Sequence, residues 1–290
     1  MNDITTEKKL YAYIKKAASF SFMAKASGLC LGFLLQLALA RLLTTTDYGA
    51  YLFLISNSLL IIAMSLMGFD KAALKILPEF EKAQSTQAVK SYHNYAFSTS
   101  IISAIIIASI FCGVLFAFYQ EKLSGLNTGI MALLIIISVL GVACSLYDGF
   151  LQSIRKPLQG QVPHQIIKPL IILSAVGVFY ALDRTLDLSL LMIINVVSAA
   201  FIFMILFFLW KINKPKFNKK EDKEIALDKS AWWKLGLGFQ VITLANMILT
   251  QTDILVIGSL LDEKSVAIYG VALKISSLLT SYIDKEFYLP

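Results

Sequence analysis

The sequence predicts an all-α polytopic membrane protein with about eight membrane-spanning helices. Of its 290 residues, 57% are hydrophobic and only 16% are charged, whereas about a quarter of the residues of a soluble protein are charged. Apolar runs of roughly 20 residues recur along the chain, the length that a helix needs to cross a bilayer core of about 30 Å. Runs such as residues 101–107 are apolar on every face and do not alternate, so helices are predicted and not barrel strands.

The predicted spans follow one another with short connections. They cover residues 17–43, 50–68, 95–118, 128–151, 166–182, 188–210, 235–261 and 266–283. The first is too long for the apolar part of a signal peptide, so we expect it to be retained. The prolines at 78, 157, 163, 169 and 215 are predicted to lie in connections or at helix starts, so we expect no span to be broken by proline.

Two connections are longer than turns. Residues 69–82 carry apolar side chains at helical spacing and charged side chains elsewhere, which predicts a short helix lying in the membrane interface. Residues 211–234 form the longest polar segment, whose composition predicts a flexible or solvated linker. The predicted domains are therefore a bundle of about six spans at residues 1–210, a basic cytoplasmic linker at residues 211–234 and a second bundle of about two spans at residues 235–290.

Basic residues are concentrated in alternate connections. The amino-terminal tail and the second, fourth and sixth connections carry Lys8, Lys9, Lys15, Lys16, Lys71, Lys75, Lys82, Lys90, Arg155, Lys156 and eight lysines between residues 211 and 234. The opposite connections hold only Lys122, Arg184 and Lys264, apart from Arg41 at a helix end. Because basic residues are retained in the cytoplasm, the amino terminus is predicted to be cytoplasmic. The net charge of +7 then reflects orientation, and no nucleic-acid partner is expected.

Catalytic, cofactor and metal sites are not expected. The cysteines Cys30, Cys112 and Cys144 fall in three different apolar runs and read as small hydrophobic residues. The two histidines, His93 and His164, are assigned to different cytoplasmic connections without metal-ligand spacing. The sequence has no nucleophile motif, phosphate-binding glycine loop or cluster of carboxylates, so no enzymatic activity is predicted.

An internal repeat is indicated at an offset of 218 residues. Leu42 and Leu43 match Leu260 and Leu261, Asp47 matches Ser265, Tyr51 matches Tyr269, and Ser58 and Leu60 match Ser276 and Leu278. A polar N-cap residue opens the next helix in both copies. Either these matches arise by chance in an apolar chain or the chain holds two related six-helix halves, and their placement favours two halves. In that case about four further spans belong after Pro290, and the chain is a truncated form.

Three segments resemble a known family. They are residues 39–43 with 47–51, residues 151–157 continuing through Gln161, Pro163, Lys168 and Pro169, and Asp253 with residues 257–258, 268–272 and Lys274. These segments are similar to the first hairpin, the connection between spans four and five, and spans seven and eight of the Wzx-type oligosaccharide and polysaccharide flippases. The wider superfamily also contains multidrug extruders. Its members usually have twelve or more spans, whereas this chain ends after about eight.

The resemblance implies a function. We expect the chain to flip a polyprenyl-pyrophosphate-linked oligosaccharide across the bacterial inner membrane during synthesis of O-antigen, capsule or exopolysaccharide. The expected partners are this lipid-linked oligosaccharide and membrane lipids, with a glycan polymerase, chain-length machinery and a coupling proton or sodium ion as further candidates. The alternatives are a multidrug or cation antiporter of the same superfamily and an inactive membrane fragment.

Lys25 and Arg41 are the cationic candidates of the first span. Lys25 lies eight residues into the span, about 12 Å at helical rise, which is deep for a headgroup contact. Either it faces a water-filled lumen and attracts the pyrophosphate of a lipid carrier, or it pairs with a neighbour or stretches along the helix. Arg41, near the outer helix end, either holds a phosphate or anchors the helix at the headgroups.

Asp253 and Lys274 are predicted to lie at similar depth on antiparallel helices. The simplest interpretation is an ion pair between them; alternatively, the aspartate binds a coupling cation and the lysine a substrate anion. Asn57 is the uncharged candidate, which either binds sugar hydroxyls or hydrogen-bonds between helices, as do the other polar residues Gln36, Asn195, Gln240, Asn246 and Gln251. The candidate substrate-binding residues are therefore Lys25, Arg41, Asn57, Asp253 and Lys274.

Overall fold

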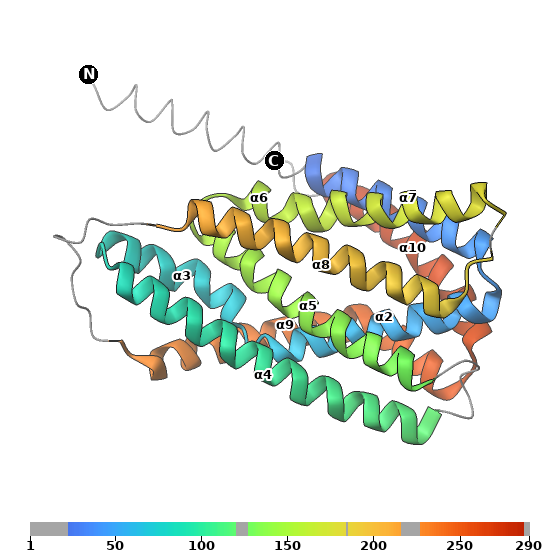
Figure 1. The fold of residues 1–290 in the computed structure, drawn as a ribbon, viewed down its shortest axis with the longest axis horizontal. Coiled ribbons are helices and arrows are strands. Elements are labelled where there is room, and N and C mark those ends of the chain that lie inside the picture. The colour runs from blue at the N-terminus through green and yellow to red at the C-terminus, as the bar shows by residue number, and fades with distance from the viewer. Residues whose placement is uncertain (1–22, 120–126, 184, 216–226, 287–290) are drawn as a thin grey trace.

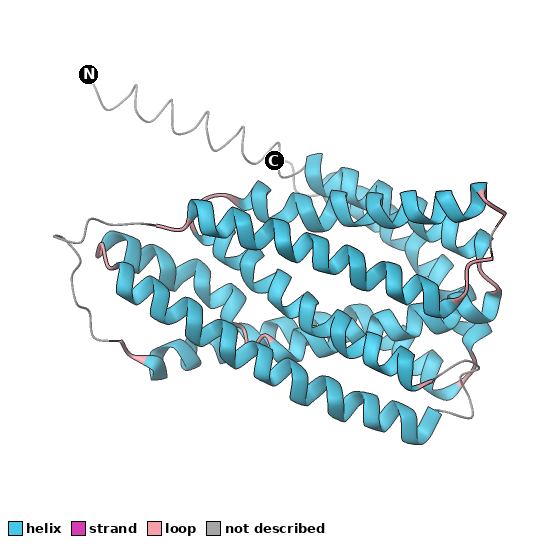
Figure 2. Cartoon of the chain, in the orientation of Figure 1, coloured by secondary structure: helices cyan, strands magenta, loops and turns pink. Residues whose placement is uncertain are grey.

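A computed structural model describes residues 23–119, 127–183, 185–215 and 227–286 (Figure 1). All regular structure in these residues is helical (Figure 2). The elements are an amino-terminal helix (Met23–Leu42), α2 (Thr45–Ser65), α3 (Phe69–Lys82), α4 (Thr86–Tyr119), α5 (Thr128–Ser153), α6 (Pro157–Val162), the π-helical turn η1 (Pro163–Ile167), α7 (Lys168–Ala181), α8 (Leu188–Asn213), α9 (Lys229–Leu260) and α10 (Glu263–Glu286). The predicted all-α class is confirmed.

Seven segments among the described residues are long and apolar enough to cross a membrane. They are Met23–Leu42, Thr45–Lys82, Thr86–Phe118, Thr128–Ser153, Pro157–Ala181, Leu188–Asn213 and Lys229–Leu260. The eighth predicted span forms α10, a helix of 24 residues that is not among these seven. The chain is therefore a polytopic membrane protein, as its composition predicts.

The connections between helices gather at two ends of the molecule. The α3–α4 turn, the α5–α6 turn and the end of α8 lie at the left in Figure 1, whereas the α7–α8 and α9–α10 connections lie at the right. We call the left end the basic end, because its connections and the adjoining helix ends carry Lys82, Lys90, Arg155, Lys156, Lys211 and Lys214. The predicted alternation of basic and non-basic connections thus corresponds to two ends of one bundle. The lysines of the amino-terminal tail and of residues 216–226 lie outside the described residues.

The segment predicted to lie in the interface is α3. The chain leaves α2 through Met67 and Gly68, both in the left-handed region with φ of 50° and 70°, and re-enters a helix at Phe69. The apolar face of α3 is buried and packs on α4, α5 and α9. The helix was predicted correctly, but its apolar face is covered by protein and not by lipid. Sequence periodicity reports which face is buried and not what covers it.

Proline does interrupt one span. The fifth span begins at Pro157 and not at residue 166, and it runs through α6, η1 and α7 with Pro163 and Pro169 inside it. Pro157 occupies the first helical turn, where no backbone donor is needed. Pro163 opens the π-helical turn, a wider turn that is common at functional sites. The expectation of no proline-broken span is therefore wrong, and His164 lies within a span and not in a connection.

The helix boundaries follow the internal repeat. The amino-terminal helix and α9 end at Leu42 and Leu260, and α2 and α10 begin at Thr45 and Glu263, each pair 218 residues apart. Both N-caps use the same hydrogen bond: Thr44 Oγ1 accepts from the Asp47 amide at 3.1 Å, and an Asp262 carboxylate oxygen accepts from the Ser265 amide at 2.8 Å. Hydrogen bonds from Ser265 also lower the pKa of Asp262. The connection is thus repeated in geometry as well as in sequence.

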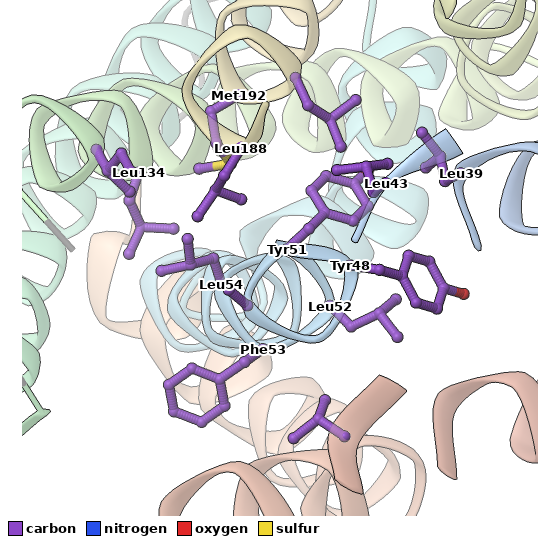
Figure 3. Packing of buried hydrophobic residues seen from close by; sticks show 14 of the residues in the cluster. Leu39, Leu43, Tyr48, Tyr51, Leu52, Phe53, Leu54, Leu134, Leu188 and Met192 are labelled. Atoms are coloured by element: carbon purple, nitrogen blue, oxygen red, sulfur yellow. The ribbon is translucent and has the colours of Figure 1, made fainter. Parts of the chain in front are cut away.

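The helix α2 lies at the centre of the molecule. Its side chains Tyr51 and Leu54 lie toward Leu134 of α5 and Met192 of α8, as Figure 3 shows, whereas Phe53 lies on the opposite side of α2, against Gly258 of α9. On its other side α2 crosses α10 so closely that a Cβ atom at Gly49 would lie 1.8 Å from the Glu263 carbonyl oxygen. Glycine at this crossing lets the backbones meet, as small residues do between membrane helices. The apolar core therefore holds the two copies of the repeat together.

Candidate functional site

Two cavities share the residue His164. The first, of about 280 Å³, is lined from α2, α3, α5, η1, α7, α8 and α9, and its polar lining residues are Ser58, Asp70, Lys71, Ser145, Asp148, His164, Lys168 and Thr243. We call it the mixed-charge cavity. The second, of about 420 Å³, is lined by Lys25, Gly28, Leu29, Gly32, Phe33, His164, Gln165, Pro169 and Lys274, and we call it the cationic cavity.

The cationic cavity brings together the first and last described helices. Lys25 comes from the amino-terminal helix and Lys274 from α10, and η1 and α7 complete the lining with His164, Gln165 and Pro169. In Figure 1 the amino-terminal helix and α7 lie at the upper edge of the molecule, and α10 runs toward them from the lower right. The described lining contains no carboxylate. Two ammonium groups and an imidazole at one cavity are side chains of the kind that can bind an anion.

Close packing at Gly28 positions η1. A Cβ atom at Gly28 would lie 2.9 Å from the Gln165 Cβ and 3.0 Å from its carbonyl oxygen, whereas a Cβ at Gly32 would meet nothing within 4 Å. Gly28 therefore serves helix packing, whereas Gly32, four residues further on, leaves space beside the cavity. Contact with the amino-terminal helix fixes the π-helical turn that carries His164.

The mixed-charge cavity contains its own counter-charges. Asp70 and Lys71, in the first turn of α3, form an ion pair at 3.6 Å. Gly149 of α5 lets the α3 backbone approach, because a Cβ atom there would lie 2.5 Å from the Asp70 carbonyl oxygen. Asp148 lies over Gly160 of α6, and its buried Oδ1 has no hydrogen-bond partner among the described residues. The lining also holds Lys168 of α7.

The predicted site residues separate into two groups. Lys25 and Lys274 line the same cavity, although no sequence pattern predicted that they would meet. Arg41 is exposed near the opposite helix end and lines neither cavity. Asn57 is buried in α2 and donates a hydrogen bond to the Phe53 carbonyl at 2.8 Å, within its own helix.

Asp253 has a hydrogen-bond partner that the sequence did not predict. The Asp253 carboxylate accepts a hydrogen bond from the Tyr269 hydroxyl at 2.5 Å. From the turn at Asp262, Asp253 is nine residues away and Lys274 twelve, so at helical rise their depths differ by about 4.5 Å. Tyr269 is nearer to the level of Asp253, which explains the partner that the structure shows.

The polar residues within spans mainly bond to other helices or to their own. The Gln240 amide nitrogen of α9 donates to the Ala63 carbonyl of α2 at 2.9 Å, and the Tyr48 hydroxyl donates to Gln36 at 2.7 Å. Asn195 donates to the Leu191 carbonyl within α8 at 3.0 Å. The expected hydrogen bonds between helices are confirmed for Gln240 and Gln36, whereas Asn195 donates within its own helix.

Sequence reasoning missed His164, Lys168 and Asp148. His164 was assigned to a connection, although a proline at position 157 is also typical of a helix start, and Lys168 lies in the first turn of the predicted span 166–182 but was not singled out. Asp148 lies inside the predicted fourth span and is a charged residue at membrane depth, which is a signal for a functional site. Treating residues 157–181 as one helix would have placed His164 within a span beside Lys168.

Comparison with known proteins gives one finding. A family model described as polysaccharide biosynthesis protein matches residues 14–284. No curated protein and no solved structure matches this chain. The matched region includes both cavities and both copies of the repeated connection.

Proposed function

We propose that this chain, which belongs to the polysaccharide biosynthesis protein family, flips a polyprenyl-pyrophosphate-linked oligosaccharide across the bacterial inner membrane. The observation that carries the proposal is the cationic cavity, where Lys25 of the first described helix and Lys274 of the last meet beside His164. The substrate would serve a surface polysaccharide such as O-antigen, capsule or exopolysaccharide. The family is one of membrane transporters and not of catalysts.

The cavity fits the charged part of this substrate. A pyrophosphate carries several negative charges on compact oxygens, and an ammonium group is a compact donor that binds phosphate as a point charge. The lipid tail stays in the bilayer, so only the pyrophosphate and sugars need a polar path. Lys25 and Lys274 neutralise the pyrophosphate, and relative movement of the first and last helices exposes it to the other side.

The proposed orientation follows the basic end. Its lysines and arginine favour the cytoplasmic side, which supports a cytoplasmic amino terminus. We propose the division into residues 1–210, 211–234 and 235–290 as a first bundle, a linker and part of a second bundle. A glycan polymerase, chain-length machinery and a coupling proton or sodium ion are proposed partners.

Reconstitution tests this function. The purified chain is placed in proteoliposomes that contain a fluorescent polyprenyl-pyrophosphate oligosaccharide in both leaflets, and a membrane-impermeant glycosidase reports the fraction that is accessible. We expect the protected fraction to become accessible over time with protein and to stay protected in protein-free liposomes. Equal protection in both would contradict the proposal, and uptake of an organic cation without movement of the glycolipid would support an antiporter instead.

A further inference from the structure

We propose that His164 is a proton-binding site whose occupancy controls anion binding in the cationic cavity. This inference rests on the proposed function, because it takes the anion to be the pyrophosphate of the substrate. It adds a linkage between a proton and that anion, carried by one side chain that borders both cavities.

The position of His164 makes it the common wall of the two cavities. It lies in η1, which packs against the amino-terminal helix at Gly28 and continues into α7. On one side are Lys25 and Lys274, and on the other are the charged groups of α3 and α5. A change in the charge of the ring therefore acts on both cavities at once.

The charged and titratable groups around His164 come from several elements. In the cationic cavity they are Lys25 and Lys274; in the mixed-charge cavity they are Asp70 and Lys71 of α3, Cys144 and Asp148 of α5, and Lys168 of α7. The cavity-lining residues of α2, α8 and α9 are uncharged, for example Ser58, Ala199 and Thr243. His164 is the only side chain in either lining whose ordinary titration range spans neutral pH.

Coulombic interactions give the direction of the linkage. Lys168 lines the mixed-charge cavity with His164, and Lys25 and Lys274 line the cationic cavity with it, so nearby positive charge opposes a further proton on the ring. A pyrophosphate between Lys25 and Lys274 reverses the sign of the field on that side. Anion binding therefore favours protonation of the ring, and a protonated ring adds a third cation to the anion site.

The mixed-charge cavity supplies a route for the proton to reach the ring. Asp148 Oδ1 is buried without a described hydrogen-bond partner, so it can accept a proton or a water molecule. Asp70 is paired with Lys71 at 3.6 Å and is less available. The two cavities then have separate tasks, one holding the anion and the other exchanging the proton.

Linkage is reciprocal, so the effect appears in anion affinity and in proton uptake. One linked proton changes the affinity by at most about tenfold per pH unit. We therefore expect wild-type protein to bind inorganic pyrophosphate more weakly as pH rises from 6 to 8, and to take up protons from the buffer on binding. Pyrophosphate itself titrates in this range, so the decisive quantity is the difference between variants.

The experiment uses the whole purified chain in nanodiscs and inorganic pyrophosphate as the probe, with titration calorimetry at pH 6, 7 and 8 in two buffers of different ionisation enthalpy. His164→Gln is compared with His93→Gln, which removes the other histidine of the chain, a residue stacked between Phe97 and Trp210 that lines neither cavity. We expect wild type and His93→Gln to show the same change in pyrophosphate affinity between pH 6 and pH 8. For His164→Gln we expect this change to be smaller by about fivefold or more, and the extra proton uptake to be lost. Equal dependence in all three proteins would overturn the inference.

A second measurement does not need a His164 variant to fold. In the His93→Gln protein labelled with isotopes at histidine, His164 is the only remaining histidine. Adding pyrophosphate at constant pH should move its ring resonances toward those of a protonated imidazole. Unchanged resonances despite measured pyrophosphate binding would overturn the linkage but not the proposed function. If wild type bound no pyrophosphate at any pH, both the linkage and the proposed function would be contradicted.

Discussion

The two cavities border the same histidine but are lined by different charges. The mixed-charge cavity contains an Asp70–Lys71 ion pair together with Asp148 and Lys168, so its charges can neutralise one another. The cationic cavity contains Lys25 and Lys274, and no carboxylate among its described lining residues. We propose that the cationic cavity holds the substrate anion, because lysines are suited to binding phosphate. In that proposal the two cavities differ in their tasks, since the charges of the mixed-charge cavity can balance one another.

The largest expected effect comes from removing both lysines of the cationic cavity. A hydrogen bond to a charged group contributes about 1.5–3 kcal/mol, so Lys25→Met with Lys274→Met should weaken pyrophosphate binding by about 100-fold or more. Titration calorimetry on the purified protein measures this. Lys264→Met, at an exposed position in the first turn of α10, is the matched control and should bind like wild type. Equal affinity of the double variant and the control would remove the distinction between the cavities.

A smaller effect is expected from the packing that shapes the cationic cavity. Gly28→Ala places a Cβ atom 2.9 Å from the Gln165 Cβ, so the helix and η1 must separate. We expect a loss of about 1–3 kcal/mol in stability, as overpacking typically costs. The midpoint of thermal unfolding in detergent should fall, and the affinity for pyrophosphate should fall with it.

Gly32→Ala is the control for this substitution, because its Cβ atom would meet nothing within 4 Å. Replacing a glycine in a helix interior by alanine stabilises the helix by about 0.5–1 kcal/mol. We expect its unfolding midpoint to stay the same or to rise. If both alanine variants behaved alike, the contact between Gly28 and η1 would not determine the shape of the site.

The smallest effect is expected at Asp253. Its carboxylate accepts a hydrogen bond from Tyr269 and lines neither cavity, so Asp253→Asn should change pyrophosphate affinity by less than about twofold and lower the unfolding midpoint only slightly. Tyr269→Phe removes the same hydrogen bond, so its unfolding midpoint should match that of Asp253→Asn. A large loss of transport with the folded Asp253→Asn protein would instead indicate a coupling cation at α9.

Much of the fold could be predicted from the sequence, because apolar length and turn chemistry are local properties. The helix ends at Leu42 and Leu260 and the caps at Thr44 and Asp262 occur where the repeat predicts them. The covering of α3 by other helices is a tertiary property, so the amphipathic pattern alone assigned it to the wrong surroundings.

The candidate site could be predicted only in part. Lys25 and Lys274 were identified because a charge within a long apolar run is visible in the sequence, but their meeting at one cavity depends on how the helices pack. His164 was missed because Pro163 reads as a helix breaker, and the π-helical turn that accommodates it is held by contact with Gly28. Lys274 was predicted as the partner of Asp253, whereas the structure shows Tyr269, because a difference of about three residues in depth changes which side chains meet.

The most direct test is the rate at which proteoliposomes flip a polyprenyl-pyrophosphate oligosaccharide, measured for wild type, for Lys25→Met with Lys274→Met, and for Lys264→Met at equal amounts of folded protein. We expect the double variant to flip at less than about one tenth of the wild-type rate, as the loss of two charge-assisted contacts implies, and Lys264→Met to match wild type. Equal rates in all three proteins would contradict a role for the cationic cavity in carrying the pyrophosphate.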